Sequence, residues 1–179
     1  MNAPFTIEEI LAALQALPRH SCPGEDALTP EFFLMHWETL ASTICSGFEC
    51  RFDSGIMPES MNEGLIFLIP KGEGRSIHIH KWRKWRPISV LNTIYKIYAK
   101  TLNNRMAQVI PRIIHSSQTG FVPERCIFYN VFRFLNATIH VETKIEDLVV
   151  LMLDFVKSYD CVDWASLHAT VSKLCFDEK

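Results

Sequence analysis

The sequence of 179 residues lacks Cys-x-x-Cys pairs, long apolar runs, internal repeats and low-complexity tracts. Its six cysteines are scattered and no apolar leader follows the acidic N-terminus, so we expect a reduced intracellular location, nuclear or cytoplasmic, and not secretion. The apolar run Leu148–Leu153 is six residues long, too short to cross a bilayer, so no membrane partner is expected. Because no linker marks a boundary, the length predicts one globular unit, or part of one.

Basic residues are scarce in the first third of the chain and abundant in the middle. Residues 1–63 hold ten Asp or Glu against Arg19 and Arg51, whereas residues 71–112 hold ten Lys or Arg against Glu73. Aromatic residues interleave with these basic ones, a mixture that suits base stacking beside phosphate contacts. We therefore predict that the middle of the chain contacts nucleic acid; the alternative is an ordinary solvated basic face. The aromatic residues concerned are Trp82, Trp85, Tyr95 and Tyr98.

The first third of the chain predicts two helices. Thr6 is a favoured N-cap residue ahead of an apolar stripe at helical spacing, and Pro18 stops that helix. Thr29 and Pro30 then begin a longer helix, which is expected to continue to about Phe52. Its apolar stripe is interpreted as core and consists of Phe33, Trp37, Leu40, Ile44 and Phe48.

Three further helices are expected in the rest of the chain. They cover residues 93–110, 127–141 and 163–174. Pro111 is expected to close the first of them, and the segment Ser116–Pro123 is predicted to be a loop. Asp163 is interpreted as the cap of the last helix and not as a metal ligand. This helix is expected to turn Trp164 and Leu167 inward, toward a core.

Two apolar runs are interpreted as short buried strands. The first covers residues 64–69 and is ended by Pro70, and the chain beyond it is expected to return antiparallel, to Arg86, as a hairpin-like finger. The second strand is expected over residues 147–155. Helices packed around a small mixed or antiparallel sheet place the chain in the α+β class.

Asp154 ends the second apolar run, and a charge at the end of a buried strand needs a reason. One reason is a divalent cation, because Mg²⁺ takes few protein carboxylates and shares its other positions with substrate phosphates. The other reason is that Asp154 caps the following turn or helix. The strand pattern alone leaves both interpretations open.

Five strings of residues stand in one order along the chain. They are Leu68–Lys71, Trp85–Asn92, Tyr95–Lys100, Gln118–Pro123 and Asp154–Asp160. In this order, and over about Phe5 to the C-terminus, the chain resembles the reverse transcriptases of non-LTR (LINE-type) retrotransposons. The resemblance implies the fingers (about residues 1–125) and the start of the palm (about residues 126–179) of a right-hand polymerase. Such an RNA-directed DNA polymerase uses an RNA template, a DNA primer and deoxynucleoside triphosphates.

The resemblance also implies roles for the residues around Asp154. Asp154 matches the family's first metal-binding Asp, and the backbone carbonyl of Phe155 matches a ligand of the same ion, Mg²⁺, with Mn²⁺ as an alternative. Tyr159 matches the bulky aromatic residue that lies under the incoming sugar and selects deoxynucleotides. Ser158 stands beside it where the family commonly has Ala, so Phe155, Ser158 and Tyr159 are expected at the nucleotide.

Two cationic residues, Lys71 and Arg86, match the family positions that grip the triphosphate. Arginine offers a planar fork for a bidentate phosphate contact, and Pro87 fixes the backbone of Arg86 in an extended conformation. A loop matches the family's contact with the template strand, and its residues are Gln118, Gly120, Phe121 and Arg125. For Phe121, a plain core position is the alternative.

The sequence departs from the family pattern at Ala27 and Glu124, where Gly is usual. If position 27 needs a positive φ, alanine there costs about 1 kcal/mol. The family's later blocks, which include the paired-Asp turn with the second metal ligand, are absent from these 179 residues, so the chain alone is expected not to polymerise. The alternative function is a non-catalytic nucleic-acid-binding remnant, and the oligomeric state stays open.

Overall fold

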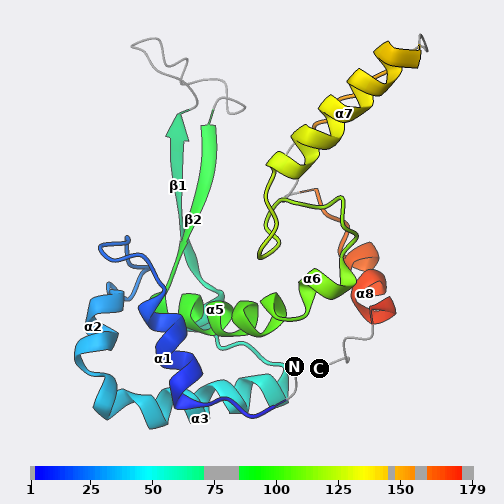
Figure 1. Cartoon of the computed structure of the whole chain (residues 1–179). Coiled ribbons are helices and arrows are strands. Elements are labelled where there is room, and N and C mark those ends of the chain that lie inside the picture. Colours follow the sequence, from blue (N-terminus) through cyan, green and yellow to red (C-terminus); the bar gives the residue numbers. More distant parts are fainter. Residues whose placement is uncertain (1–2, 71–84, 145–147, 156–160, 175–179) are drawn as a thin grey trace. The chain divides into compact units, whose positions relative to one another are not determined.

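The computed structural model describes residues 3–70, 85–144, 148–155 and 161–174 (Figure 1). The chain divides between Asn104 and Arg105 into two compact units, the N-terminal unit and the C-terminal unit. Most of the predicted finger, residues 71–84, lies outside the described residues, and so do residues 156–160. The described part contains helices and a two-stranded antiparallel sheet, so the predicted α+β class is confirmed at this level.

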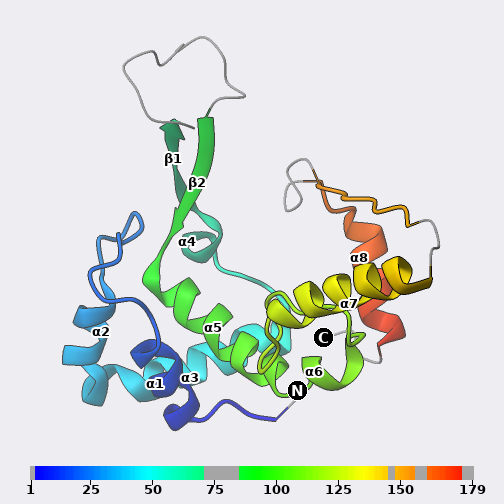
Figure 2. The same ribbon diagram turned by 45° about the horizontal axis from the view of Figure 1, so that its top comes forward.

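In its described residues, the N-terminal unit consists of helices and a β-hairpin. The elements are α1 (Ile7–Gln15), α2 (Pro30–Met35), α3 (Trp37–Ser54), α4 (Glu59–Asn62), β1 (Gly64–Pro70), β2 (Trp85–Leu91) and α5 (Thr93–Ala107), whose last three residues belong to the C-terminal unit. Figures 1 and 2 show α1, α2 and α3 gathered around α5, and the hairpin extending from the start of α5. The short helix α4 lies beside the base of the hairpin (Figure 2).

The first helix begins at the predicted N-cap. The Thr6 hydroxyl accepts a hydrogen bond from the Glu9 amide at 3.2 Å, and the Glu9 carboxylate accepts one from the Thr6 amide at 3.0 Å. This reciprocal pair satisfies two of the amides that a helix start leaves unpaired. α1 ends at Gln15, before Pro18, and buries Ile10, Ala13 and Leu14.

The single helix predicted from Thr29 to about Phe52 is wrong in one respect, because His36 divides it into α2 and α3. His36 has φ −104° and ψ 19°, outside helical values, and its carbonyl accepts the Leu40 amide at 3.1 Å to begin α3. Because the chain changes direction there, residues of both helices reach the same core, as the predicted stripe requires. Phe33, Ile44 and Phe48 are buried, and Trp37 and Leu40 are partly buried against them.

Aromatic rings form the centre of this core. The ring of Phe5 lies 6.0 Å from that of Phe48, and Phe48 lies 5.0 Å from Tyr98, measured between ring centroids. Both contacts are edge-to-face, a geometry that adds about 0.5–1.5 kcal/mol to the burial of the rings. Since Tyr98 and the buried Ile97 belong to α5, the core joins the start of the chain to α3 and α5.

The helix predicted over residues 93–110 stops at Ala107, and Pro111 does not close it. The amides of Gln108 and Val109 donate to carbonyls three residues back, at 3.3 and 2.9 Å, which tightens the last turn. Pro111 instead lies in the first turn of α6 (Ile110–Ile113). Proline is favoured there because its missing N–H would be unpaired at a helix start in any case.

The predicted antiparallel hairpin is confirmed, but the predicted burial of its first strand is wrong. β1 pairs with β2 from Gly64 opposite Leu91 to Pro70 opposite Trp85. The side chains of residues 65–69 are 41 to 66% exposed, so both faces of β1 are open. An apolar run indicates a strand that prefers burial, but it does not specify which element covers that strand.

In its described residues, the C-terminal unit contains α6, α7 (Phe128–Lys144) and α8 (Trp164–Lys173). The predicted cap of α8 is confirmed: the Asp163 carboxylate accepts the Ser166 hydroxyl at 2.7 Å and the Ser166 amide at 3.1 Å. These hydrogen bonds hold the pKa of Asp163 below its usual value. The inward orientation predicted for Trp164 and Leu167 is wrong, because they are 73% and 42% exposed.

The strand predicted over residues 147–155 is wrong for the residues described. Leu148–Phe155 have no regular secondary structure, and Val149 and Leu151 are 91% and 77% exposed. A strand forms when a neighbour accepts and donates its backbone hydrogen bonds, and no described strand pairs with this segment. The run therefore has the composition of a buried strand without the partner that would make it one.

The cysteines that the structure describes are free thiols: Cys22, Cys45, Cys50, Cys126 and Cys161. Burial raises the pKa of Cys45, aided by nearby glutamates, and its thiol donates to the Phe5 carbonyl at 3.3 Å. Within the ranges described, no helix has the length and apolar character needed to cross a membrane.

Ala27 has a φ of 56°, the positive value that the family pattern implies at this position. Because this conformation strains a residue with a Cβ atom, we expect Ala27→Gly to raise the free energy of unfolding by about 1 kcal/mol. The change is measured as a shift of the urea midpoint at constant slope. Ala12→Gly, at an exposed position within α1, is the control and should lower stability by about 1 kcal/mol. An unchanged or lower midpoint for Ala27→Gly would contradict the prediction.

Candidate functional site

Arg125 holds together the loop between α6 and α7. Its Nη1 atom donates to the carbonyls of His115 and Gln118 at 2.7 and 2.8 Å. Its Nη2 atom donates to the carbonyls of Pro111 and Ile114 at 2.8 and 2.9 Å. The rigid fork of guanidinium donors can serve these four carbonyls at once, because each of the two Nη atoms carries two N–H groups. Arg125, for which the resemblance implies a template contact, therefore also shapes the loop from within.

Asn130 connects the same loop to α7, and the sequence analysis missed it. The Asn130 Nδ2 atom donates to the Thr119 hydroxyl at 2.9 Å and to the Ser117 carbonyl at 3.2 Å. Thr119 is buried, and Ser117 is in turn bonded to the His115 ring at 2.7 Å. The available signal was a lone asparagine within the aromatic first turn of α7, where a polar side chain needs a partner.

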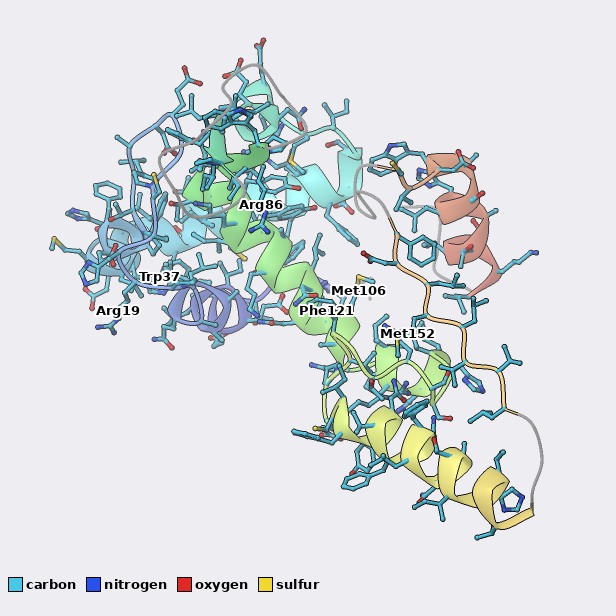
Figure 3. The ribbon with its side chains drawn as sticks, turned by 90° about the horizontal axis from the view of Figure 1, so that it is seen from above. Arg19, Trp37, Arg86, Met106, Phe121 and Met152 are labelled. Carbon is cyan, nitrogen blue, oxygen red and sulfur yellow. The ribbon has the colours of Figure 1, made fainter. Side chains whose placement is uncertain are left out.

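Phe121 lies on the outside of this loop, where it is labelled in Figure 3. Its side chain is 97% exposed and its φ is 60°, so the alternative of a core position is wrong. Beside it, a Cβ atom at Gly120 would meet nothing closer than the Gln118 Nε2 atom at 3.8 Å. The Gln118 Nε2 atom itself donates to the Gly120 carbonyl at 3.1 Å. The loop thus presents an aromatic ring next to an open stretch of backbone.

Arg86 lies in β2, opposite Ile69 of β1, and is labelled in Figure 3. Its side chain is exposed and forms no ion pair with any described residue. Pro87 follows it within the strand, so the backbone at Arg86 is extended as predicted. Lys71, the second cationic residue expected at the triphosphate, lies outside the described residues.

Asp154 and Phe155 stand at the end of the described segment Leu148–Phe155, and both are exposed. Among the residues that the structure describes, no three His, Cys, Asp or Glu side chains gather where they could hold a metal ion. Mg²⁺ is held in proteins through one or two carboxylates together with waters and substrate phosphates, so Asp154 would be one ligand among several. The described residues do not complete such a set of ligands, and Ser158 and Tyr159 lie outside them.

Comparison with known proteins identifies the family. Residues 69–179, more than half of the chain, match the family model described as reverse transcriptase (RNA-dependent DNA polymerase). The chain belongs to the reverse transcriptase family. It is also 35% identical over 177 residues to the transposon TX1 uncharacterized 149 kDa protein of Xenopus laevis. The predicted resemblance to the reverse transcriptases of LINE-type retroelements is thereby confirmed.

The chain corresponds to a small part of the Xenopus protein. The alignment with the Xenopus protein covers 98% of this chain but 13% of that protein's length. The family match includes Arg86, the loop that Arg125 holds, and Asp154. Reverse transcriptases in general act on a nucleic-acid template with nucleotide substrates and use divalent metal ions.

Proposed function

We propose that the chain supplies the fingers, about residues 1–125, and the start of the palm, about residues 126–179, of an RNA-directed DNA polymerase. Its partners are an RNA template, a DNA primer and deoxynucleoside triphosphates. The observation that carries this proposal is the family match over residues 69–179, because that region contains the basic hairpin strand, the loop before α7 and Asp154.

The loop that Arg125 holds meets the template strand in this proposal. Phe121 offers an open ring face, and stacking of a base on such a ring contributes about 1–3 kcal/mol. Because the four hydrogen bonds of Arg125 order the loop before any strand arrives, little conformational entropy is lost on binding. Gln118 and Gly120 lie beside the ring, and the open face of Gly120 admits a close approach of the strand.

The triphosphate binds to Arg86 and Lys71 in this proposal. An exposed guanidinium without an ion pair among the described residues is available for a bidentate phosphate contact. Phe155, Ser158 and Tyr159 contact the rest of the nucleotide, and the bulk of Tyr159 would exclude a sugar with a 2′-hydroxyl.

Asp154 and the Phe155 carbonyl each contribute a ligand to a Mg²⁺ or Mn²⁺ site that requires further carboxylates. Two-metal nucleotidyl transfer needs ions held about 3.5–4 Å apart. The residues described contain no acidic cluster for that purpose. We therefore expect the 179-residue chain alone to bind nucleic acid without extending a primer.

A non-catalytic nucleic-acid-binding role is the second candidate. The exposure of Phe121 favours it, because stacking and phosphate contacts need no metal ion. A primer-extension assay with Mg²⁺ on the 179-residue chain tests whether it is catalytic. Robust extension would exclude a purely non-catalytic role, and it would also contradict the expectation that the chain alone does not extend a primer.

Phe121→Leu tests the template contact. Leucine keeps an apolar side chain at the same φ but has no ring face, so RNA affinity should fall roughly 5- to 150-fold, the equivalent of one lost stacking contact. Phe121→Tyr keeps the ring and should bind like the parent chain. Fluorescence anisotropy with a single-stranded RNA measures both variants, over a series of salt concentrations.

Two outcomes of that experiment count against the proposal. Equal affinities of Phe121→Leu and Phe121→Tyr would exclude stacking at this position. An affinity that does not change with salt would exclude phosphate contacts by the Lys and Arg residues within 71–112, because such contacts release counterions.

A further inference from the structure

The side-chain amide of Asn92 joins three segments of the N-terminal unit. Its Nδ2 atom donates to the Ser60 carbonyl at 2.7 Å, and its Oδ1 atom accepts the Asp26 amide at 3.4 Å. Asn92 directly follows β2, whereas Ser60 lies in α4, shortly before β1 begins. One side chain, only 6% exposed, thus connects both strands at the base of the hairpin to the loop that precedes α2.

Further hydrogen bonds fix this loop, residues 20–28, to its neighbours. The Thr93 hydroxyl donates to the Leu28 carbonyl at 2.6 Å, and the Lys96 ammonium donates to the Cys22 carbonyl at 2.9 Å. At its other end, the His20 amide donates to the Glu31 carboxylate at 2.8 Å. Since Thr93 and Lys96 both belong to α5, the loop is bound to the same helix start that Asn92 precedes.

The loop lies against the backbone of Asn92 without room for a side chain at Gly24. A Cβ atom at Gly24 would lie 2.6 Å from the Asn92 amide nitrogen and 2.7 Å from its Cα atom. Neither backbone atom can move away by a rotamer change. The contact therefore depends on glycine, and it adds packing to the hydrogen bonds of the Asn92 amide.

We propose that Asn92 is a positioning residue that sets the direction of the β1–β2 hairpin and, through it, the location of Arg86. This inference rests on the proposed function, in which Arg86 grips the triphosphate. The hairpin depends on its base for orientation because both faces of β1 are exposed.

Arg86 lies far enough from Asn92 along β2 that a small change of angle at the base of the hairpin would displace it. Six residues separate them, which is about 20 Å along a strand. A tilt of about 10° at the base would move Arg86 by about 3.5 Å, more than a hydrogen bond tolerates. A small loss of order at Asn92 would therefore remove Arg86 from a phosphate that it otherwise reaches.

Amide hydrogen exchange on the whole chain tests the inference without any ligand. Asn92→Ala removes both side-chain hydrogen bonds and should accelerate exchange in β1 and β2 about tenfold or more, while exchange in α1 and α3 stays as in the parent chain. The matched control is Asn62→Ala, which removes a hydrogen bond of an exposed asparagine to the Met57 carbonyl in the same region. This control should leave the hairpin unchanged.

A milder variant guards against a general loss of folding. Lys96→Met releases only the Cys22 carbonyl and should give a smaller acceleration with the same pattern. Unchanged exchange in the hairpin of both variants would overturn the inference. So would an equal acceleration in α1 and α3, because Asn92 would then stabilise the unit in general.

Binding of inorganic tripolyphosphate separates this inference from the proposed function. Weaker binding by both Asn92→Ala and Arg86→Gln, relative to the parent chain, supports the two together. If Arg86→Gln binds like the parent chain while Asn92→Ala still loosens the hairpin, Arg86 has no role at the triphosphate and the positioning role of Asn92 stands.

Discussion

Replacing Arg125 with methionine is expected to open the loop between α6 and α7 and to lower RNA affinity at least about tenfold. The substitution removes four hydrogen bonds from a charged donor, each to a different backbone carbonyl. Hydrogen bonds to charged groups contribute about 1.5–3 kcal/mol each when buried, but the freed carbonyls of this loop regain water. We therefore expect a net loss of about 2–4 kcal/mol in the stability of the loop.

Arg125→Lys provides the decisive comparison. Lysine keeps the charge but concentrates it on one nitrogen, which cannot reach four carbonyls, so Arg125→Lys should behave almost like Arg125→Met. Arg133→Met, at an exposed position of α7, is the matched control and should change stability by less than about 0.5 kcal/mol. Amide exchange over residues 114–124 and RNA anisotropy measure the effects. If Arg125→Lys matched the parent chain in both amide exchange and RNA affinity, the positive charge alone would be sufficient. The conclusion that the hydrogen bonds of Arg125 hold the loop together would then be wrong.

Local chemistry made much of the secondary structure predictable from the sequence. Thr6 and Asp163 are short polar residues ahead of apolar stripes, and both cap the helices that they were predicted to begin. Gly55 ends α3 with a φ of 66°, in the segment where the sequence breaks its helical pattern. Each of these signals depends on a few neighbouring residues, so one sequence is enough to read it.

Burial was less predictable because it depends on elements far away in the chain. The runs that form β1 and residues 148–155 have similar compositions, yet only the first is a strand, and both are exposed in the described structure. The apolar composition of a segment indicates how strongly burial would stabilise it, but the element that would bury it lies elsewhere in the chain. For the same reason, the break at His36 was missed, since the core on which α2 and α3 converge determines it.

In the candidate site, the order of the motifs along the sequence was predictable, whereas the contacts between distant residues were not. The order of the motifs was sufficient to recognise the family, and Arg86 was correctly placed on an antiparallel strand. The four carbonyls around Arg125 and the three segments around Asn92 come together only in the folded chain. No spacing rule in the sequence marks either residue as a connector, because their partners are backbone groups, which every residue carries.

Gly24→Ala is expected to destabilise the N-terminal unit by about 3 kcal/mol. The added Cβ atom would overlap the backbone of Asn92, so the loop must move away from the base of the hairpin. That movement would lengthen the hydrogen bonds of the Asp26 amide to Asn92 and of the Thr93 hydroxyl to Leu28. Urea unfolding measures the loss, and amide exchange in β1 and β2 should rise with it.

Two other positions make this a test of space and not of glycine as such. Gly47→Ala, within α3, meets only the Arg51 Nη1 atom at 3.4 Å and should stabilise the chain by about 0.5–1 kcal/mol through helix propensity. Ala27→Gly, in the same loop as Gly24, should also stabilise the chain, because φ is positive at Ala27. The φ of Gly24, in contrast, is not positive. Position 24 thus requires glycine for the close contact with Asn92, and position 27 favours glycine for its backbone conformation. A stable Gly24→Ala variant would mean that the loop does not lie against Asn92, and the positioning role of Asn92 would lose its packing support.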